Sequence, residues 1–272
     1  MGGYTVVSIA YSPLFFKTNL LFPKTCVNKG YCKKYDPQRG FSTMIYVTAD
    51  LHGDVDRLRS LPVKLGRKDT LIVLGDFGFL WDGSKAEKKM LKWLGKRRYQ
   101  LLFLDGAHEN YDLLDSYQVT DFAGGRAQQI SGKLYHLMRG EVYTIEEKKL
   151  LCFGGGESPD MDTRIEGQSW WSRELPSDEE YARCETSIAA CDNQVDYVLT
   201  HALPARMLTF MNLETRGLLE TNPLENYFDE LAAKLQYTHW YFGSQHRDQT
   251  LGPKATAVYK KVLPLFKVQR KK

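Results

Sequence analysis

Long apolar runs are absent from this sequence. A membrane-spanning helix needs roughly 18 consecutive apolar residues, whereas the apolar patch Leu14–Phe16 ends at Lys17. The same patch is a poor signal peptide because no small-residue cleavage site flanks it. Val6 stands where N-myristoylation needs Ser or Thr. We therefore expect a cytoplasmic protein with no membrane partner.

Cysteine is scarce, and its five residues show no zinc-binding spacing. An odd number of dispersed cysteines is typical of reduced cytoplasmic thiols. No motif pairs any of them with a base, so none is expected to be a nucleophile. Cys152, Cys184 and Cys191 are predicted to pack as small hydrophobes.

A strong charge of either sign is also lacking. The chain carries a net charge of +4, to which residues 1–43 contribute +5, so the remainder carries −1. A basic excess confined to an appendage is poor evidence for a nucleic-acid-binding domain. Nucleic acid is therefore expected only as a substrate.

Composition divides the chain into three parts. Residues 1–43 contain Gly and Pro breakers and no sustained period. They are predicted to be an N-terminal extension outside the fold, with a partner-binding arm as the alternative. Residues 44–268 are predicted to form one α/β domain, since 43% hydrophobic and 26% charged residues suit one large globular body. Residues 269–272 are expected to be a solvated basic tail.

Five short apolar segments each lead into a residue type that binds metals. Met44–Thr48 is followed by Asp50 and His52, which can converge on one ion in the loop where open α/β sheets place their sites. The other segments are Ile72–Leu74 before Asp76, Leu101–Leu104 before His108, Val195–Thr200 before His201, and Trp240–Gly243 before His246.

Four of the six histidines follow such segments. Taken singly, a histidine is more often a hydrogen-bonded structural residue than a metal ligand. Polar residues at five strand ends in series reverse that preference, because a divalent cation needs carboxylates and imidazoles gathered from several elements onto one face.

This ordered set resembles the calcineurin-like metallophosphoesterases, over roughly residues 44–265. Their pattern is Asp-x-His, Gly-Asp, Gly-Asn-His-Asp/Glu, His and Gly-His-x-His, and the set is specific although each motif alone is weak. Residues 75–82 and 167–171 look like a small bacterial and phage branch. The resemblance implies a four-layer α/β/β/α sandwich. The matching residues are Asp50-Leu51-His52, Gly75-Asp76, Gly106-Ala107-His108-Glu109, Thr200-His201 and Gly243-Ser244-Gln245-His246.

The resemblance also implies two metal positions, of which only the first is complete. The second would share Asp76 and use His201, but Ala107 replaces an asparagine amide and Ser244 replaces an imidazole. That position should be weak unless water, substrate phosphate, Gln245 or Asp248 fills the gap. Mixed oxygen and nitrogen ligands suit Mn, Fe, Zn or Ni. The first ion would be held by Asp50, His52, Asp76 and His246.

By the same resemblance, His108 is the catalytic residue. Its imidazole would stabilise or protonate the phosphate, with Glu109 orienting it. One ion can polarise a phosphoryl oxygen and supply hydroxide. The lost second ion would remove part of the charge stabilisation that carries the rate.

Helix and strand signals fill the sequence between the motifs. Ser84–Glu87 and Ser177–Glu180 are predicted capping boxes, and Asn222–Glu225 joins a cap, a proline and an acid. Strand, helix and strand alternate through the first half, which predicts parallel βαβ units. A second sheet is predicted from Glu141–Ile145, Lys149–Phe153 and Ala255–Leu263.

A long connection follows Gly154–Gly156, which lacks the Gly-Lys-Ser/Thr ending of a phosphate loop and predicts a tight turn. Long loops in compact domains are often functional. Arg164 is expected to meet a substrate phosphate, and Trp170 to stack on a base or sugar. The equally weighted alternative is that Trp170 and Trp171 pin the loop to the body.

Three functions fit these residues. The first is a metal-dependent hydrolase of phosphomonoesters or phosphodiesters with one tightly bound ion and a second that is weak or absent. The second is an inactive relative that binds a phospholigand or a partner. The third is a phage or mobile-element protein that binds a host partner and uses the metal only for structure. The retained His108 favours the first, whereas the paired losses at Ala107 and Ser244 favour the second.

A chain that begins at Met44 tests the predicted extension. If residues 1–43 lie outside the fold, this shortened protein stays in solution and its thermal midpoint, followed by circular dichroism, lies within a few degrees of that of the full chain. A large drop in the midpoint, or loss of folded protein, would place the extension within the domain.

Overall fold

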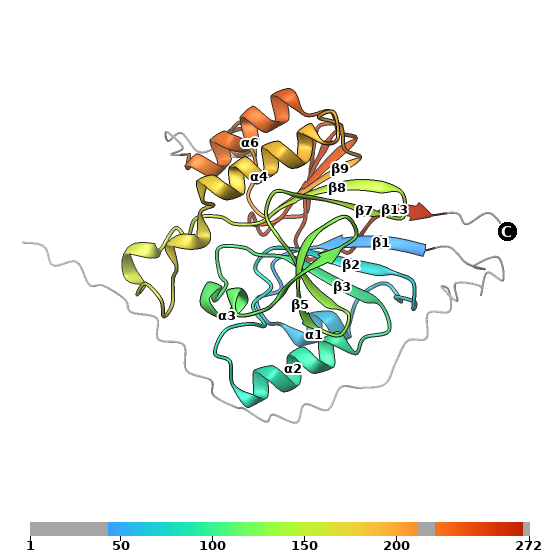
Figure 1. Cartoon of the computed structure of the whole chain (residues 1–272), viewed down its shortest axis with the longest axis vertical. Helices are drawn as coiled ribbons and strands as arrows, with labels where there is room; N and C mark the ends of the chain where they lie inside the picture. The colour runs from blue at the N-terminus through green and yellow to red at the C-terminus, as the bar shows by residue number, and fades with distance from the viewer. Residues whose placement is uncertain (1–42, 212–220, 269–272) are drawn as a thin grey trace, which may run out of the picture. The chain divides into compact units, whose positions relative to one another are not determined.

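The structure is a computed structural model that describes residues 43–211 and 221–268 (Figure 1). The predicted tail 269–272 and, except for Thr43, the predicted extension 1–43 lie outside the described residues. Two mixed sheets with helices place the described chain in the α/β class, as predicted. None of its helices combines the length and the apolar character that crossing a bilayer demands.

The first sheet has seven strands in the order β13-β1-β2-β3-β6-β5-β4. Its centre, β1 to β3 and then β6, is parallel, which confirms the βαβ prediction, while β13, β5 and β4 pair antiparallel. The strands are β1 (Thr43–Thr48), β2 (Thr70–Leu74), β3 (Gln100–Leu104), β4 (Val119–Phe122), β5 (Gly125–Ser131), β6 (Leu134–Leu137) and β13 (Leu263–Val268).

The second sheet has six strands in the order β11-β12-β10-β9-β8-β7. Strands β8, β9, β10 and β12 are parallel, and the two outer strands are antiparallel to their neighbours. The strands are β7 (Glu141–Ile145), β8 (Lys148–Phe153), β9 (Tyr197–Thr200), β10 (His239–Phe242), β11 (Gln249–Leu251) and β12 (Ala255–Ala257).

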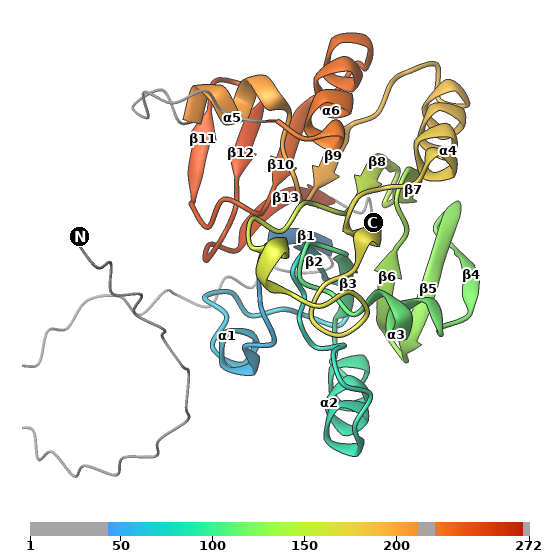
Figure 2. The same cartoon turned by 90° about the vertical axis from the view of Figure 1, so that its left-hand side faces the viewer.

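The helices divide between the two sheets (Figure 2). Helices α1 to α3 lie beside the first sheet and α4 to α6 beside the second. Two short 3-10 turns interrupt the long connection after β8. The bounds are α1 (Val55–Arg59), α2 (Lys85–Gly95), α3 (Tyr111–Asp115), η1 (Met161–Thr163), η2 (Ser172–Glu174), α4 (Asp178–Ala189), α5 (Ala205–Met211) and α6 (Pro223–Lys234).

Three hydrophobic clusters fill the interior. One joins the first sheet to α1–α3, and one joins the second sheet to α4–α6. The third draws Ile72 and Leu104 from the first sheet and Cys152 and Leu199 from the second, and all four are fully buried. Strands with apolar residues on both faces are typical of parallel sheets covered on both sides.

Two of the three predicted helix caps are complete. Ser177 with Glu180, and Asn222 with Glu225, form reciprocal capping boxes. Ser84 caps α2 by accepting from the Glu87 N–H. The second hydrogen bond of the predicted capping box, from the Ser84 N–H to the Glu87 carboxylate, is not formed, so that part of the prediction is wrong. The Glu87 carboxylate accepts instead from the N–H groups of residues 81–83, because the preceding turn folds back over the helix start.

The predicted single strand Ala255–Leu263 is wrong. Its first part is β12 in the second sheet, but the chain turns at Tyr259–Lys261, where three N–H groups donate to the Asp248 carboxylate. The chain then enters β13, which pairs with β1 in the first sheet. The cysteine prediction is confirmed for Cys152 and Cys184, which are buried free thiols, whereas Cys191 is partly exposed.

Candidate metal centre

The predicted site residues follow strands that end at one edge of each sheet. Strands β1 to β3 are parallel neighbours in the first sheet, and β9 and β10 are parallel neighbours in the second. Loops after parallel strands meet at a common edge. The structure therefore brings together six side chains that are far apart in the sequence, since His52 and His246, for example, are separated by 194 positions. They are Asp50, His52, Asp76, His108, His201 and His246.

Four of these residues have left-handed backbone conformations. The φ angles are 49° for Asp50, 47° for His52, 45° for Asp76 and 48° for His246. Positive φ is uncommon for residues other than glycine and is held only where the surroundings fix it. Here the Asp50 N–H donates to the Gly75 carbonyl at 3.2 Å and the His52 N–H to the Asp76 carbonyl at 2.8 Å.

Arg57 of α1 holds the loop after β1 in place, and no sequence motif indicated this contact. Its guanidinium donates to the carbonyl oxygens of Asp50 at 2.6 Å, Ala49 at 3.0 Å and Tyr259 at 2.7 Å. Tyr259 in turn stacks on the His246 ring, with centroids 4.8 Å apart. One side chain thus ties the loop after β1 to the segment that supports the last histidine.

Two groups of side chains have ligand atoms close enough to hold a metal ion. The atoms of Asp50, Asp76 and His246 lie within 4.8 Å of one another, as do those of His52, Asp76 and His108. The Nε2 atoms of His52 and His246 lie 3.2 Å apart. Two nitrogens bound to one ion at about 2.0–2.1 Å, with angles of about 90–110°, lie about 2.9–3.4 Å apart. The two imidazoles therefore already have the spacing of common ligands.

The Asp50 carboxylate is costly to bury in this site. It is fully buried, and its Oδ2 atom has no hydrogen-bond partner among the described residues, whereas Oδ1 accepts from the Ser244 N–H at 3.2 Å. Burial raises the pKa of Asp50 to about 7. A buried oxygen with no partner carries a desolvation penalty that a bound cation would offset.

Asp76 lies at the centre, between three imidazoles. Burial alone would raise its pKa, but His201 and His108 outweigh that effect and hold the pKa of Asp76 well below its usual value. The Nδ1 atom of His201 lies 3.0 Å from the Leu74 carbonyl, so it must carry the proton. The other ring nitrogen, Nε2, lies 3.5 Å from Asp76 Oδ1, and a histidine that binds a metal commonly donates its second ring N–H to a carbonyl in this way.

His108 is bound to Asp76 twice. Its backbone N–H donates to Oδ1 at 2.9 Å, and its ring Nδ1 lies 3.1 Å from Oδ2. That side-chain hydrogen bond raises the pKa of His108. Asp76, and not the expected Glu109, is thus the hydrogen-bonded partner that orients the ring. Glu109 is buried and accepts instead from the Phe77 N–H at 2.6 Å, which holds the loop after β2.

The expected second metal position has become part of a pocket of about 380 Å³. Ala107 and Ser244 line it but offer only a methyl group and a hydroxyl, and Gln245 donates to the Ser244 hydroxyl at 3.2 Å. Asp248, considered as a replacement ligand, is used for the turn after β12. The other lining residues include Glu157, Asn222 and Glu225, and the sequence assigned none of them to this site, since Asn222 and Glu225 were predicted only as a helix cap.

The connection after β8 carries Arg164, whose charge acts on His108 but is outweighed by Asp76, which raises the pKa of that imidazole. Asp160 binds the Arg164 guanidinium through two nitrogens at 2.8 and 2.9 Å, so the donors that the expected phosphate contact needs are already engaged. Trp170 is half-buried in the same connection. Trp171 is buried and donates to Asp112, so it pins the connection to the body.

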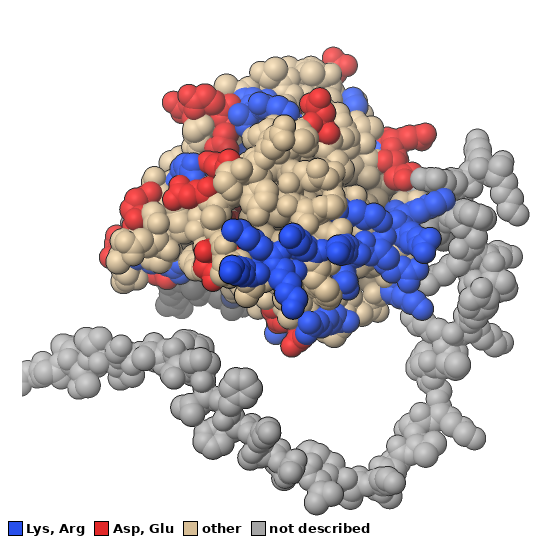
Figure 3. Space-filling view, turned by 60° about the horizontal axis from the view of Figure 1, so that its bottom comes forward, with Lys and Arg blue, Asp and Glu red and all other residues tan. Residues whose placement is uncertain are grey.

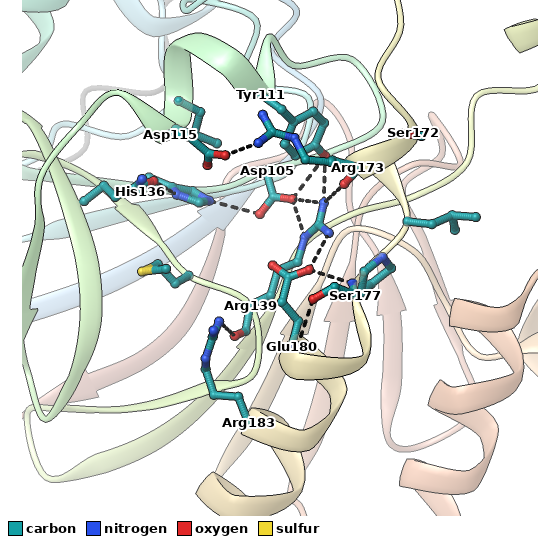
Figure 4. A pocket seen from close by; sticks show the side chains of 15 residues that line it. Asp105, Tyr111, Asp115, His136, Arg139, Ser172, Arg173, Ser177, Glu180 and Arg183 are labelled. Carbon is teal, nitrogen blue, oxygen red and sulfur yellow. Dashed lines mark hydrogen bonds and ion pairs between the residues drawn. The ribbon is translucent and has the colours of Figure 1, made fainter. Parts of the chain in front are cut away.

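A buried ion-pair network anchors this connection, and no sequence motif predicted it. Figure 4 shows Arg139 donating to Asp105 and Glu180, with His136 on the other side of Asp105. Arg139 also donates to the Arg173 and Glu174 carbonyls at the end of the connection. Burial would raise the pKa of Asp105, but Arg139 and His136 keep it well below its usual value. The sequence feature from which this network could have been predicted is Asp105, a carboxylate that directly follows the apolar strand β3.

No protein-family model matches the chain, and no curated protein matches it. Any functional interpretation therefore depends on the residues and the geometry described above.

The buried network allows a stability test. Arg139→Met leaves Asp105 buried without its main partner, which is expected to lower the free energy of unfolding by about 3–5 kcal/mol. Arg183 lines a cavity together with Asp105 and Arg139 but is only partly buried. Arg183→Met is therefore expected to lower the free energy of unfolding by about 1 kcal/mol or less. Urea denaturation measures both. Equal losses in the two variants would show that the Asp105–Arg139 pair has no special role.

Proposed function

We propose that this chain is a metal-dependent phosphoesterase of the calcineurin-like type, which hydrolyses a phosphomonoester or phosphodiester with one tightly held ion. The observation that carries the proposal is the convergence of the buried, unpartnered Asp50 Oδ2 with Asp76 and His246. The four-layer α/β/β/α order belongs to the same proposal. It is supported by three hydrophobic clusters, one of which joins the two sheets.

The donor set fits a first-row transition metal. Asp50, Asp76, His52 and His246 offer two carboxylates and two imidazoles, a mixture that suits Mn, Fe, Zn or Ni. When bound, such an ion supplies a water of lowered pKa and polarises a phosphoryl oxygen. His201 and Asp76 provide two ligands for a second ion, which we propose is weakly bound or absent because Ala107 and Ser244 complete the set poorly.

His108 would act as the acid at the phosphoester. Asp76 holds its Nδ1, so Nε2 is the ring atom left to give or take a proton. The side chain is about one-third exposed and lines the same pocket as Ala107 and Ser244. A substrate entering that pocket would therefore meet His108 at its wall. Trp170 and Arg164 are proposed as substrate contacts farther out, with Arg164 exchanging one bond to Asp160 for a phosphate.

The alternative is a binding module that keeps the metal and has lost turnover. Both lost ligands belong to one position, and the pocket that replaces it has room for a phosphate group. A scaffold has no use for an imidazole held against Asp76, and this observation favours the enzyme.

Metal content tests the proposal directly. We expect close to one ion per chain by elemental analysis after dialysis, and hydrolysis of generic monoester or diester substrates with added manganese. Asp50→Asn and His246→Ala should each lose the ion, because each removes a ligand from the only complete set. His239→Gln is the matched control, since His239 lies within β10, bonds Thr256 and should keep the ion. Two ions retained through dialysis, or no ion at all, would contradict the proposed site.

Restoring the two lost ligands tests the reason for weak catalysis. Ala107→Asn together with Ser244→His should rebuild the second position and raise the hydrolysis rate by roughly 10²-fold or more, because two ions stabilise both the attacking and leaving oxygens. The single changes should give far less, since residues that act as a unit are not additive. Histidine is tolerated at the positive φ of Ser244. A double variant that binds two ions and hydrolyses no phosphoester would favour the binding module.

A further inference from the structure

The domain is nearly neutral overall, but its charged side chains are distributed unevenly over its surface. Figure 3 shows Lys and Arg side chains gathered on the face that includes α2, with few acidic side chains among them. The sequence between Ser84 and Arg98 holds seven basic residues and a single acid, Glu87. The net charge of the chain therefore did not predict this basic face.

Five lysines form the centre of this basic face. Lys85, Lys88, Lys89, Lys92 and Lys96 are all exposed and recur at intervals of three or four residues. They therefore line the solvent side of one helix over about 16 Å. None of the five forms an ion pair with any residue in the part of the chain that the structure describes.

The single acid of α2 does not neutralise these lysines. Both carboxylate oxygens of Glu87 accept from the N–H groups of Trp81, Asp82 and Gly83, which hold the turn before the helix. The carboxylate is thereby directed to the start of α2, away from Lys92 and Lys96 on later turns. Glu87 keeps its charge but forms no ion pair with these lysines, so the five lysines outnumber the one acid along α2.

Beyond the end of α2 the basic face continues into a hollow of about 370 Å³. Arg67, Lys68 and Lys133 line it, together with the polar side chains of Gln100 and Thr144 and the acidic side chain of Glu146. Asp69 also lines it, but its two oxygens accept from the backbone N–H groups of Met44 and Gly66. The basic face therefore includes the row of lysines on α2 and the hollow beyond the end of that helix.

We propose that this basic face binds the phosphate backbone of a nucleic-acid duplex without reading its sequence. A row of unpaired lysines neutralises successive phosphates and releases their counterions, which is the main source of non-specific affinity. Lysine presents a compact point charge on a flexible stem, which suits contacts with phosphates, and it lacks the rigid planar fork of arginine. Nucleic acid was expected only as a substrate because charge was summed along the chain, over residues 1–43 and over the remainder, and not over one face of the fold.

Two features favour a duplex over the other polyanions. The apolar side of α2, with Leu91 and Leu94, is buried in the core, so the helix has no apolar face to insert into a lipid surface. Single strands bind by stacking bases on aromatic rings, but the ring of Trp93 is covered by Arg97 at 3.7 Å and approached by Arg59 at 5.5 Å.

The test is the salt dependence of binding by the full chain to a fluorescent 20-base-pair duplex of arbitrary sequence, measured by anisotropy. Replacing Lys88, Lys89 and Lys92 by Gln preserves helix propensity and removes three phosphate contacts. The slope of log K against log salt should become shallower by about 2.7, at about 0.9 per contact, and affinity at low salt should fall on the order of a hundredfold.

A matched triple variant controls for net charge. Lys149→Gln, Lys234→Gln and Lys254→Gln remove three exposed lysines from the second sheet and its helices, and both slope and affinity should stay at the wild-type values. Circular dichroism checks that both variants are folded. Absence of duplex binding by the wild type, or an equal loss in the two variants, overturns the proposal. A loss that appears only with vesicles containing 30 mol % phosphatidylserine also overturns it, in favour of a membrane. Binding is read without hydrolysis, so failure here leaves the proposed metal chemistry untouched.

Discussion

The desolvated carboxylate of Asp50 is the constraint on which the site depends. Its burial is costly, and its neighbours are arranged around it: Arg57 clamps its carbonyl, Ser244 donates to one oxygen, and His246 approaches the other. The left-handed backbone at Asp50, His52 and Asp76 stores further strain in the same loops. Proteins retain such a combination where binding of a ligand recovers its cost.

The strand-end residues were predictable because each is local to an apolar strand, and parallel strands deliver their carboxyl ends to one edge. The partners of those residues were not. Glu109 sits beside His108 in the sequence, yet its carboxylate turns to Phe77 on a neighbouring loop. Arg139 and Asp105 are 34 positions apart, so no periodicity could pair them. The break inside Ala255–Leu263 likewise depends on Asp248, which acts on that turn from β11's side.

The distribution of charge likewise depends on the fold and could not be predicted from the order of residues in the sequence. A sum over the sequence returns a domain close to neutral, but folding places the lysines of α2 on one surface and leaves their only helical acid bound to backbone. Long-range fields depend on that arrangement more than on the total. The metal centre, by contrast, depends on a few buried groups whose charges are matched at contact distance.

The pairing of β1 with β13 has a consequence for how the protein is made. β1 is among the first strands to leave the ribosome and β13 is the last strand described, yet they are hydrogen-bonded neighbours. Until β13 arrives, β1 presents an open edge to other chains, a hazard during synthesis. His246 emerges only shortly before that edge closes, so the side chains of the candidate metal centre can come together only late in folding.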